Sequence, residues 1–325
     1  MTSAHLITNQ DLFSQVSSFL SPNDLGRLQR VNKGLKKCVN DIAEEILGML
    51  RDNHQIHLRC LGMWETIESF TPPINKVYLI SSRLLQISGQ DKDTAVDCSI
   101  ESFSNLISDA SKQEAKNHLE LFQWIAQEFR LALPDELQAP VIEQREAYCL
   151  DNPNALINWL HSNKNTLERI ESIQLQPFKG TTLPKEFLDF FPNLKELMLN
   201  NECDNLTVLP DGFLNNCTQL KKLMIRLCPQ LTALPDGFLD KCTELKKLDI
   251  RICHKLKTLP DGFLDKCSQL NELALTDCPQ LKTLPDGFLD KCTQLEKLAL
   301  TNCPQLTALP DGFLDKCTQL EKLAL

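Results

Sequence analysis

The sequence predicts an α + α/β protein, in which an amino-terminal helical part precedes a solenoid whose coils form a parallel sheet. Two observations predict it. The segment LPDGFLDKCTQLEKLAL at residues 284–300 returns unchanged at 309–325, and close variants begin at 209, 234 and 259, a period of 25 residues. A fixed period of this size is typical of stacked coils. Before residue 170, apolar residues recur mainly at helical spacing instead.

Composition narrows the classes of function. The chain has 325 residues, which is long enough for two domains or for one compact domain joined to an extended array. An apolar content of 42% and a charged content of 24% are those of a folded, soluble protein. A net charge of −9 argues against nucleic acid or an anionic membrane as the main partner. No apolar run approaches the ~20 residues that span a bilayer, and the amino terminus lacks a secretory signal. We therefore expect a cytoplasmic protein with no membrane or nucleic-acid partner.

Residues 8–48 form the first expected element, a small bundle of helices. A break at Ser21-Pro22-Asn23 separates two apolar stripes at helical spacing, the first formed by Leu12, Val16, Phe19 and Leu20 and the second by Leu25, Leu28, Val31 and Leu35. Physical chemistry alone predicts a helical hairpin here.

The segment DLFSQVSSFLSPNDLGRLQRV, residues 11–31, resembles the F-box, the trihelical motif that docks on the Skp-type adaptor of SCF ubiquitin ligases. The family's leading Leu-Pro is Thr8-Asn9 here, and its Cys and Trp after the valine are Asn32 and Leu35. The resemblance implies an adaptor-binding set of Leu12, Phe13, Val16, Phe19, Leu20, Pro22, Leu25 and Val31. The alternative is the three-helix start of a generic helical domain.

Residues 49–151 are expected to be a helical linker domain. Within it, residues 112–131 have an amphipathic pattern, with apolar Leu119, Phe122, Trp124, Ile125 and Phe129. Residues 152–169 then predict a helix that covers the first coil of the solenoid through Ala155, Leu156, Trp159 and Leu160.

Residues 170–325 carry the repeats of 25–26 residues. Their consensus is L-x-x-L-x-[LI]-x-x-C, seen for example at Leu220, Leu223, Ile225 and Cys228, and a degenerate first copy begins at Ile170. This pattern resembles the leucine-rich repeat. It predicts seven parallel strands that line a concave face, with the L-x-L side chains turned inward. The last copy ends inside its strand without a polar cap, so we expect a truncated product, a frayed coil or a coil that something else covers.

Phenylalanines and cysteines also recur in each repeat. Phe213, Phe238, Phe263, Phe288 and Phe313 predict a core spine on the convex side, reached by a turn at a proline and about one helical turn. The chain has 14 cysteines, ten of them in the repeats, at spacings that do not suit zinc. Stacking brings equivalent cysteines within the range of a disulfide, but reduced, inert core thiols suit the cytosol better.

The outward strand positions are the candidate target-binding surface, since packing fixes the inward ones. Lysines and arginines dominate them in two coils and predict an acidic target protein; the alternative is that these side chains only solvate the strands. The full set is Lys221, Lys222, Met224, Arg226, Lys246, Lys247, Asp249 and Arg251. Alanines at 274, 299 and 324 leave the later surface shallow, so we do not expect a binding hot spot there.

We find no motif of an enzyme, a cofactor site or a metal site in the sequence. An F-box before leucine-rich repeats is the layout of substrate receptors, which dock on a Skp-type adaptor and present a target for ubiquitination. The near-identical repeats would also suit a bacterial imitation that acts in the host cytosol. The alternatives are a leucine-rich-repeat interaction protein without a ubiquitin-ligase role, and an enzyme hidden in residues 50–150.

Overall fold

The computed structural model describes residues 44, 47, 48, 80, 84, 100–176, 178, 180–200 and 203–325. The expected adaptor-binding residues, from Leu12 to Val31, lie outside these residues, as does most of the range 49–99. The chain divides into two compact units, one with Met1–Lys116 and Val141–Pro153, the other with Asn117–Pro140 and Asn154–Leu325. The second unit thus includes residues 117–140, which the sequence analysis assigned to the linker domain.

The described helices of the first unit are the start of α7 (Ile100–Phe129) and all of α8 (Ile142–Asp151). Ile107, Ala110 and Ala115 of α7 are buried, as is Cys149 of α8. Helix α7 confirms the predicted helix at 112–131 but begins earlier. It ends at Phe129, because the φ of 53° at Arg130 breaks the helical hydrogen bonding before Pro134 is reached.

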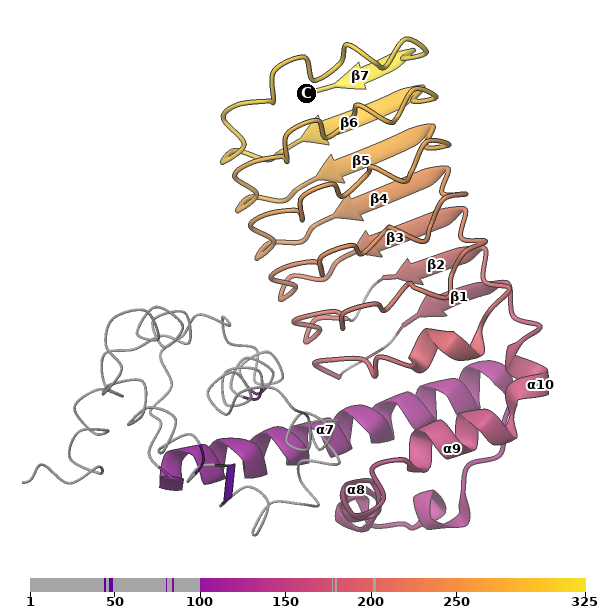
Figure 1. Ribbon diagram of the computed structural model, residues 1–325. Helices are drawn as coiled ribbons and strands as arrows, with labels where there is room; N and C mark the ends of the chain where they lie inside the picture. Colours follow the sequence, from indigo (N-terminus) through magenta and orange to yellow (C-terminus); the bar gives the residue numbers. More distant parts are fainter. Residues whose placement is uncertain are drawn as a thin grey trace, which may run out of the picture. The chain divides into compact units, whose positions relative to one another are not determined.

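Seven parallel strands stack in chain order to form the sheet of the second unit (Figure 1). The strands are β1 (Ser172–Leu175), β2 (Glu196–Leu199), β3 (Lys222–Arg226), β4 (Lys247–Arg251), β5 (Glu272–Thr276), β6 (Lys297–Thr301) and β7 (Lys322–Ala324). From β3 onward, paired residues are 25 positions apart, as with Leu223 and Leu248. The repeat period therefore sets the register, which confirms the predicted parallel solenoid.

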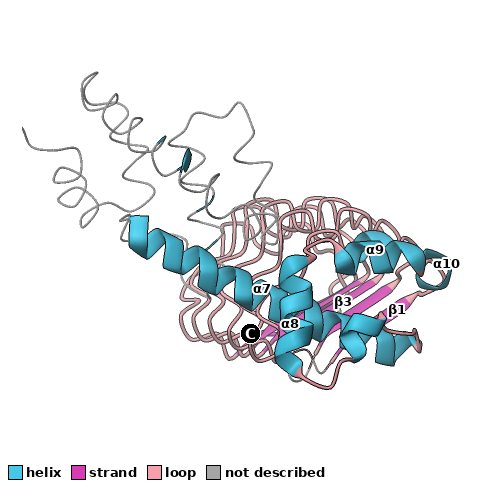
Figure 2. Cartoon of the chain, turned by 90° about the horizontal axis from the view of Figure 1, so that it is seen from below, coloured by secondary structure: helices cyan, strands magenta, loops and turns pink. Residues whose placement is uncertain are grey.

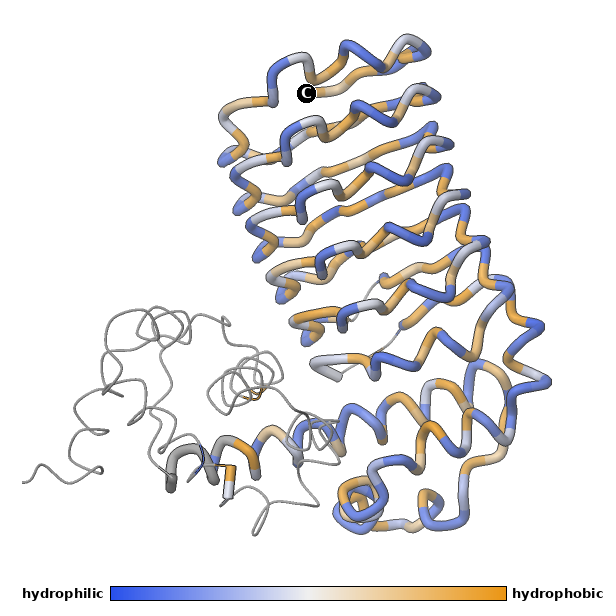
Figure 3. The backbone as a smooth tube through the Cα atoms, viewed as in Figure 1, coloured by the Kyte–Doolittle hydropathy of each residue, from blue (hydrophilic) through white to orange (hydrophobic). Residues whose placement is uncertain are grey.

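The inward leucines form a continuous core because no single coil can bury them alone. Leu220, Leu223 and Ile225 are fully buried, and the equivalent residues of the next two coils are at most 2% exposed. In Figure 3 the same apolar bands recur along every coil. Four of the five spine phenylalanines are also buried, and Phe313 of the last coil is half-buried. The predicted core is confirmed.

The segment between each proline and the next cysteine is a series of turns, so the prediction of about one helical turn is wrong. Its backbone bonds are three residues apart, as from Phe288 N to Pro285 O (3.2 Å) and from Cys292 N to Leu289 O (3.0 Å). Gly287 has a φ of +65°, which a right-handed helix cannot contain. A Cβ there would lie 3.0 Å from Oδ2 of Asp290, so this position favours glycine twice over.

The first coil includes the 3₁₀ turn η2 (Phe187–Phe190), and the end of α7 and α9 (Ala155–Ser162) cover it. Seen end-on in Figure 2, the coils superpose behind α9 and the short α10 (Lys164–Leu167). The ring centroids of Trp159 and Phe122 are 5.1 Å apart, and Trp159 donates its Nε1–H to Ala132 O. Trp124 donates its Nε1–H to Gln176 O. Leu156, Trp159 and Leu160 are buried as predicted, and Ala155 is half-buried.

The turn η1 (Asp135–Gln138) links α7 to α8. None of the helices formed by the described residues has the length and apolar character that crossing a membrane requires.

Candidate functional site

Side chains that alternate with the buried leucines lie on the other face of the sheet, which we call the open face. The in-register pairing arranges them in three rows across the strands. The first row is Ser172, Glu196, Lys222, Lys247, Glu272, Lys297 and Lys322. The middle row is Gln174, Met198, Met224, Asp249, Ala274, Ala299 and Ala324. The third row is Arg226, Arg251, Thr276 and Thr301.

Ion pairs between neighbouring coils connect the first row. Lys222 lies 3.5 Å from Glu196, Lys247 lies 2.5 Å from Glu272, and Lys297 pairs with the other oxygen of Glu272. Hydrogen bonds from Lys247 first and Lys297 second lower the pKa of Glu272 to about 2, and the same contact raises the pKa of Lys297. Glu272 is therefore ionised at neutral pH and holds two lysines in place.

Asp249 is the one charged residue of the middle row, and its side chain is only 1% exposed. It accepts a hydrogen bond from Arg251 Nε at 2.5 Å, and its other oxygen pairs with Arg226 Nη2. The side chain of Arg226 is 31% exposed and that of Arg251 is 42% exposed. One carboxylate thus neutralises half of the charge of two arginines that stay accessible.

The structure brings six of the eight predicted target-binding residues together on β3 and β4: Lys222, Met224, Arg226, Lys247, Asp249 and Arg251. Lys221 and Lys246 are exposed and each lies one residue before its strand, at the rim of the face. The expected basic stripe is partly neutralised, because carboxylates of the neighbouring coils pair with its lysines. Even so, the seven strands carry six basic and three acidic side chains, an excess of three positive charges.

A trough crosses the later strands, where the sequence suggested only a shallow surface. Its floor is Ala274, Ala299 and Ala324, and its volume is about 260 Å³. Lys247, Glu272, Lys297 and Lys322 line the same hollow from the first row, and Asp249 and Arg251 line it at β4. The sequence contains a signal for this trough, because alanines 25 residues apart form one row of short side chains across the strands.

Two series of cysteine thiols lie in the core of the solenoid. Cys228, Cys253 and Cys278 are fully buried and contact strand carbonyls, as Cys253 Sγ does with Ile225 O at 3.8 Å. Burial raises the pKa of the Cys267 and Cys292 thiols to about 12, which leaves them protonated at neutral pH. All eleven cysteines of the described segments are free thiols. These segments contain no group of three His, Cys, Asp or Glu side chains that could hold a metal ion.

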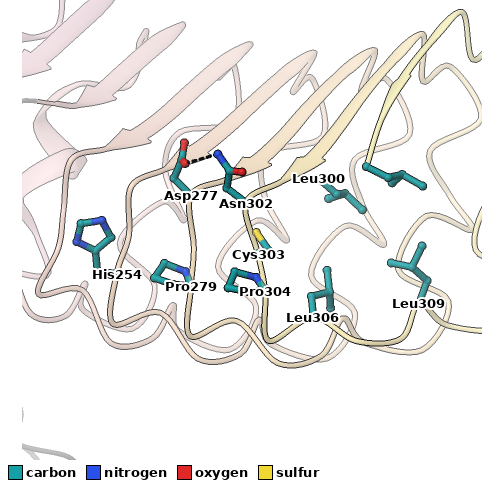
Figure 4. Close-up of a pocket in the computed structure, with 10 residues that line it drawn as sticks. His254, Asp277, Pro279, Leu300, Asn302, Cys303, Pro304, Leu306 and Leu309 are labelled. Atoms are coloured by element: carbon teal, nitrogen blue, oxygen red, sulfur yellow. Dashed lines mark hydrogen bonds between the residues drawn. The ribbon is translucent and has the colours of Figure 1, made fainter.

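A second hollow, of about 640 Å³, is lined by residues of the last three coils, from His254 to Leu325 (Figure 4). Asn302 donates to Asp277 Oδ1 at 2.8 Å beside it, and His254 lies in the row continued by Pro279 and Pro304. Its apolar walls include Leu309 and Leu325, which are 38% and 66% exposed and belong to the inner row of the last coil. This hollow shares no lining residue with the trough on the open face.

A comparison with known protein families supports the identification of the repeated segment as leucine-rich repeats. Residues 181–321 match the family described as the BspA type leucine rich repeat region, in six copies. The structure of a TLR13–ssRNA13 complex matches 50% of this chain and 26% of that chain, with 18% identity and a TM-score of 0.38. The leucine-rich repeat domain of the type III effector XopL matches 88% of this chain and 95% of that chain, with 18% identity and a TM-score of 0.35. No curated protein sequence matches the chain.

Proposed function

We propose that this chain, with its leucine-rich repeat region, is a protein-interaction module whose open face binds an acidic segment of a partner protein. One observation carries the proposal. The seven strands present an excess of three positive charges, although the whole chain has a net charge of −9. Complementary charge on a rigid surface selects and steers an oppositely charged partner.

The arrangement of the charges supports binding rather than mere solvation. Asp249 and Glu272 hold four of the six basic side chains in fixed positions. Side chains that are already ordered lose less conformational entropy when a partner binds. The buried, protonated thiols add no nucleophile to this face. The role that fits these features is binding without catalysis.

The test selects binders without bias and then maps them. Peptides are selected from a random display library on the full-length chain, and their affinities are compared for the wild type and for Lys222→Glu/Lys247→Glu. We expect the double variant to weaken the selected peptides at least about tenfold and to flatten the salt dependence of binding.

The matched control is Lys241→Glu/Lys266→Glu, which makes the same charge change at exposed lysines in the turns. It should leave the affinity within about twofold of the wild type. Equal affinity for the wild type and the Lys222→Glu/Lys247→Glu variant would refute the proposal, as would an equal loss in the control.

A more specific role, that of a substrate receptor in an SCF-type ubiquitin ligase, rests on the F-box resemblance of residues 11–31 alone. The family match lies in the repeats, so it gives no support to this role. The role requires that the full-length chain bind a purified Skp-type adaptor and that Leu20→Asp abolish the binding. An adaptor that does not bind the wild-type chain would leave a leucine-rich-repeat interaction protein without a ubiquitin-ligase role.

A further inference from the structure

We infer that the trough over β4–β7 is a binding site for an extended peptide in which small and acidic residues alternate. The inference rests on the proposed function and names the site and the ligand. The trough exists because a row of short side chains lies beside a row of longer ones. Alanine occupies the middle row in β5, β6 and β7, whereas β2 and β3 place methionine there.

One side of the trough is charged. Lys247, Lys297 and Lys322 line it with Glu272 among them, whereas Thr276 and Thr301 belong to the third row and do not line the trough. The end at β4 is occupied by Asp249 with Arg251. A ligand therefore meets ammonium groups along one wall and a guanidinium at one end, over a floor of methyl groups.

The dimensions suit an extended chain that crosses the strands. Four strands at a spacing of about 4.8 Å give the trough a length of about 14 Å, which is about four residues of extended peptide. Alternate side chains of such a peptide point in opposite directions. Those facing the alanine floor must be small, and those facing away can carry carboxylates that the long lysine side chains reach.

The chemistry favours a peptide over a single-stranded nucleic acid. Bases bind single-strand sites largely by stacking on aromatic side chains, and the open face of the seven strands presents none. Glu272 and Asp249 also place carboxylates beside the path that phosphates would follow. A peptide contributes backbone groups and separate carboxylates, which fit between these charges.

The experiment uses the full-length chain and a fluorescein-labelled hexapeptide of alternating glutamate and alanine, with binding read as fluorescence anisotropy. Ala299→Met should weaken binding at least about tenfold, because it fills the floor with a side chain that the same row already holds at Met198 and Met224. Lys322→Glu should do the same through charge. Ala308→Met and Lys291→Glu make the same changes at exposed positions in the loops and should bind as the wild type does.

Other outcomes separate the inference from the proposal on which it rests. If Lys222→Glu weakens the hexapeptide but Ala299→Met and Lys322→Glu do not, the trough is wrong and the open face remains the binding surface. If none of the three variants changes the affinity, both the trough site and the proposed binding function of the open face are wrong. Tighter binding of a hexamer of uridylate, lost in Ala299→Met, would overturn the peptide and assign the trough to nucleic acid. Equal binding of a lysine–alanine hexapeptide would overturn the role of charge.

Discussion

Arg251 donates from Nε to Oδ1 of Asp249 at 2.5 Å, and the two residues are two positions apart on β4. Arg226 is the register partner of Arg251 on the adjacent strand and pairs with the other oxygen of the same carboxylate. Like charges directly opposite one another on neighbouring strands are destabilising. Asp249 therefore allows two arginines to occupy adjacent places on the open face.

This arrangement predicts that Asp249→Ala lowers the free energy of unfolding by about 1.5–3 kcal/mol, the order expected when hydrogen bonds to a charged group are lost. Alanine is tolerated in this row, since Ala274 and Ala299 occupy it, so the loss reflects the two uncompensated guanidinium groups. It stays below the ~3–5 kcal/mol of a fully buried pair because both arginines are partly exposed. Urea denaturation followed by circular dichroism measures the change.

The control replaces the whole cluster with the residues of the next coils. Asp249→Ala combined with Arg226→Thr and Arg251→Thr removes the repulsion together with the carboxylate, so most of the lost stability should return. A triple variant that is no more stable than Asp249→Ala alone would contradict the role given to the carboxylate.

One backbone position of each coil predicts a stabilising substitution. The residue before the strand-end cysteine has φ near 55° in four coils, and it is Leu227, Ile252, Asp277 and Asn302 in turn. Its amide continues the pairing beyond the strand, as from Ile252 N to Thr276 O at 3.1 Å. Asparagine tolerates this left-handed conformation, whereas a β-branched residue is strained there by about 1–2 kcal/mol.

Ile252→Asn should therefore raise the free energy of unfolding by about 1 kcal/mol. The backbone strain energy that it relieves is larger than the hydrophobic stabilisation lost with a half-buried isoleucine side chain. The reciprocal change Asn302→Ile should lower it by a similar amount. Both are measured by denaturation in urea. The strain argument fails if Ile252→Asn is destabilising while Asn302→Ile is neutral.

The repeat period was enough to predict the core, the strand order and the register, because every coil repeats one set of contacts. Leu223 and Leu248 are equivalent in sequence and paired in the sheet. The cap was predicted only in part. Trp159 was expected there, but the helix that carries Trp124 also belongs to it, and a contact between residues 124 and 176 has no periodic signal.

The open face shows why composition within one coil misleads. Lys247 looks like part of a basic stripe until Glu272, one coil later, becomes its neighbour. The strained backbone was also hidden, because Leu227 and Ile252 are not residues that indicate a left-handed conformation, whereas Asp277 and Asn302 are. The charge pattern of the open face depends on contacts between coils, and the sequence of a single coil does not reveal these contacts.

The thiols of the core link stability to alkaline pH. Burial is the main cause that raises the pKa of Cys292 from its ordinary value of 9.0 to about 12, and neighbouring Cys267 and Cys317 contribute. The folded state thus favours the neutral thiol. An unfolded chain releases this proton above pH 9 while the folded chain retains it to about pH 12. The stability from this group is complete below pH 9 and is lost as the pH rises toward 12.

Cys292→Ala should make the fall of the unfolding free energy above pH 9 less steep, by up to about 1.4 kcal/mol per pH unit, because one fewer proton is released on unfolding. Urea denaturation under reducing conditions between pH 8 and 11 measures the slope. Leu295→Val is the control, since it lowers the stability of the same buried coil without removing a titrating group. If both variants keep the wild-type slope, the Cys292 thiol ionises equally in the folded and unfolded chain, and its place in the core does not protect its proton.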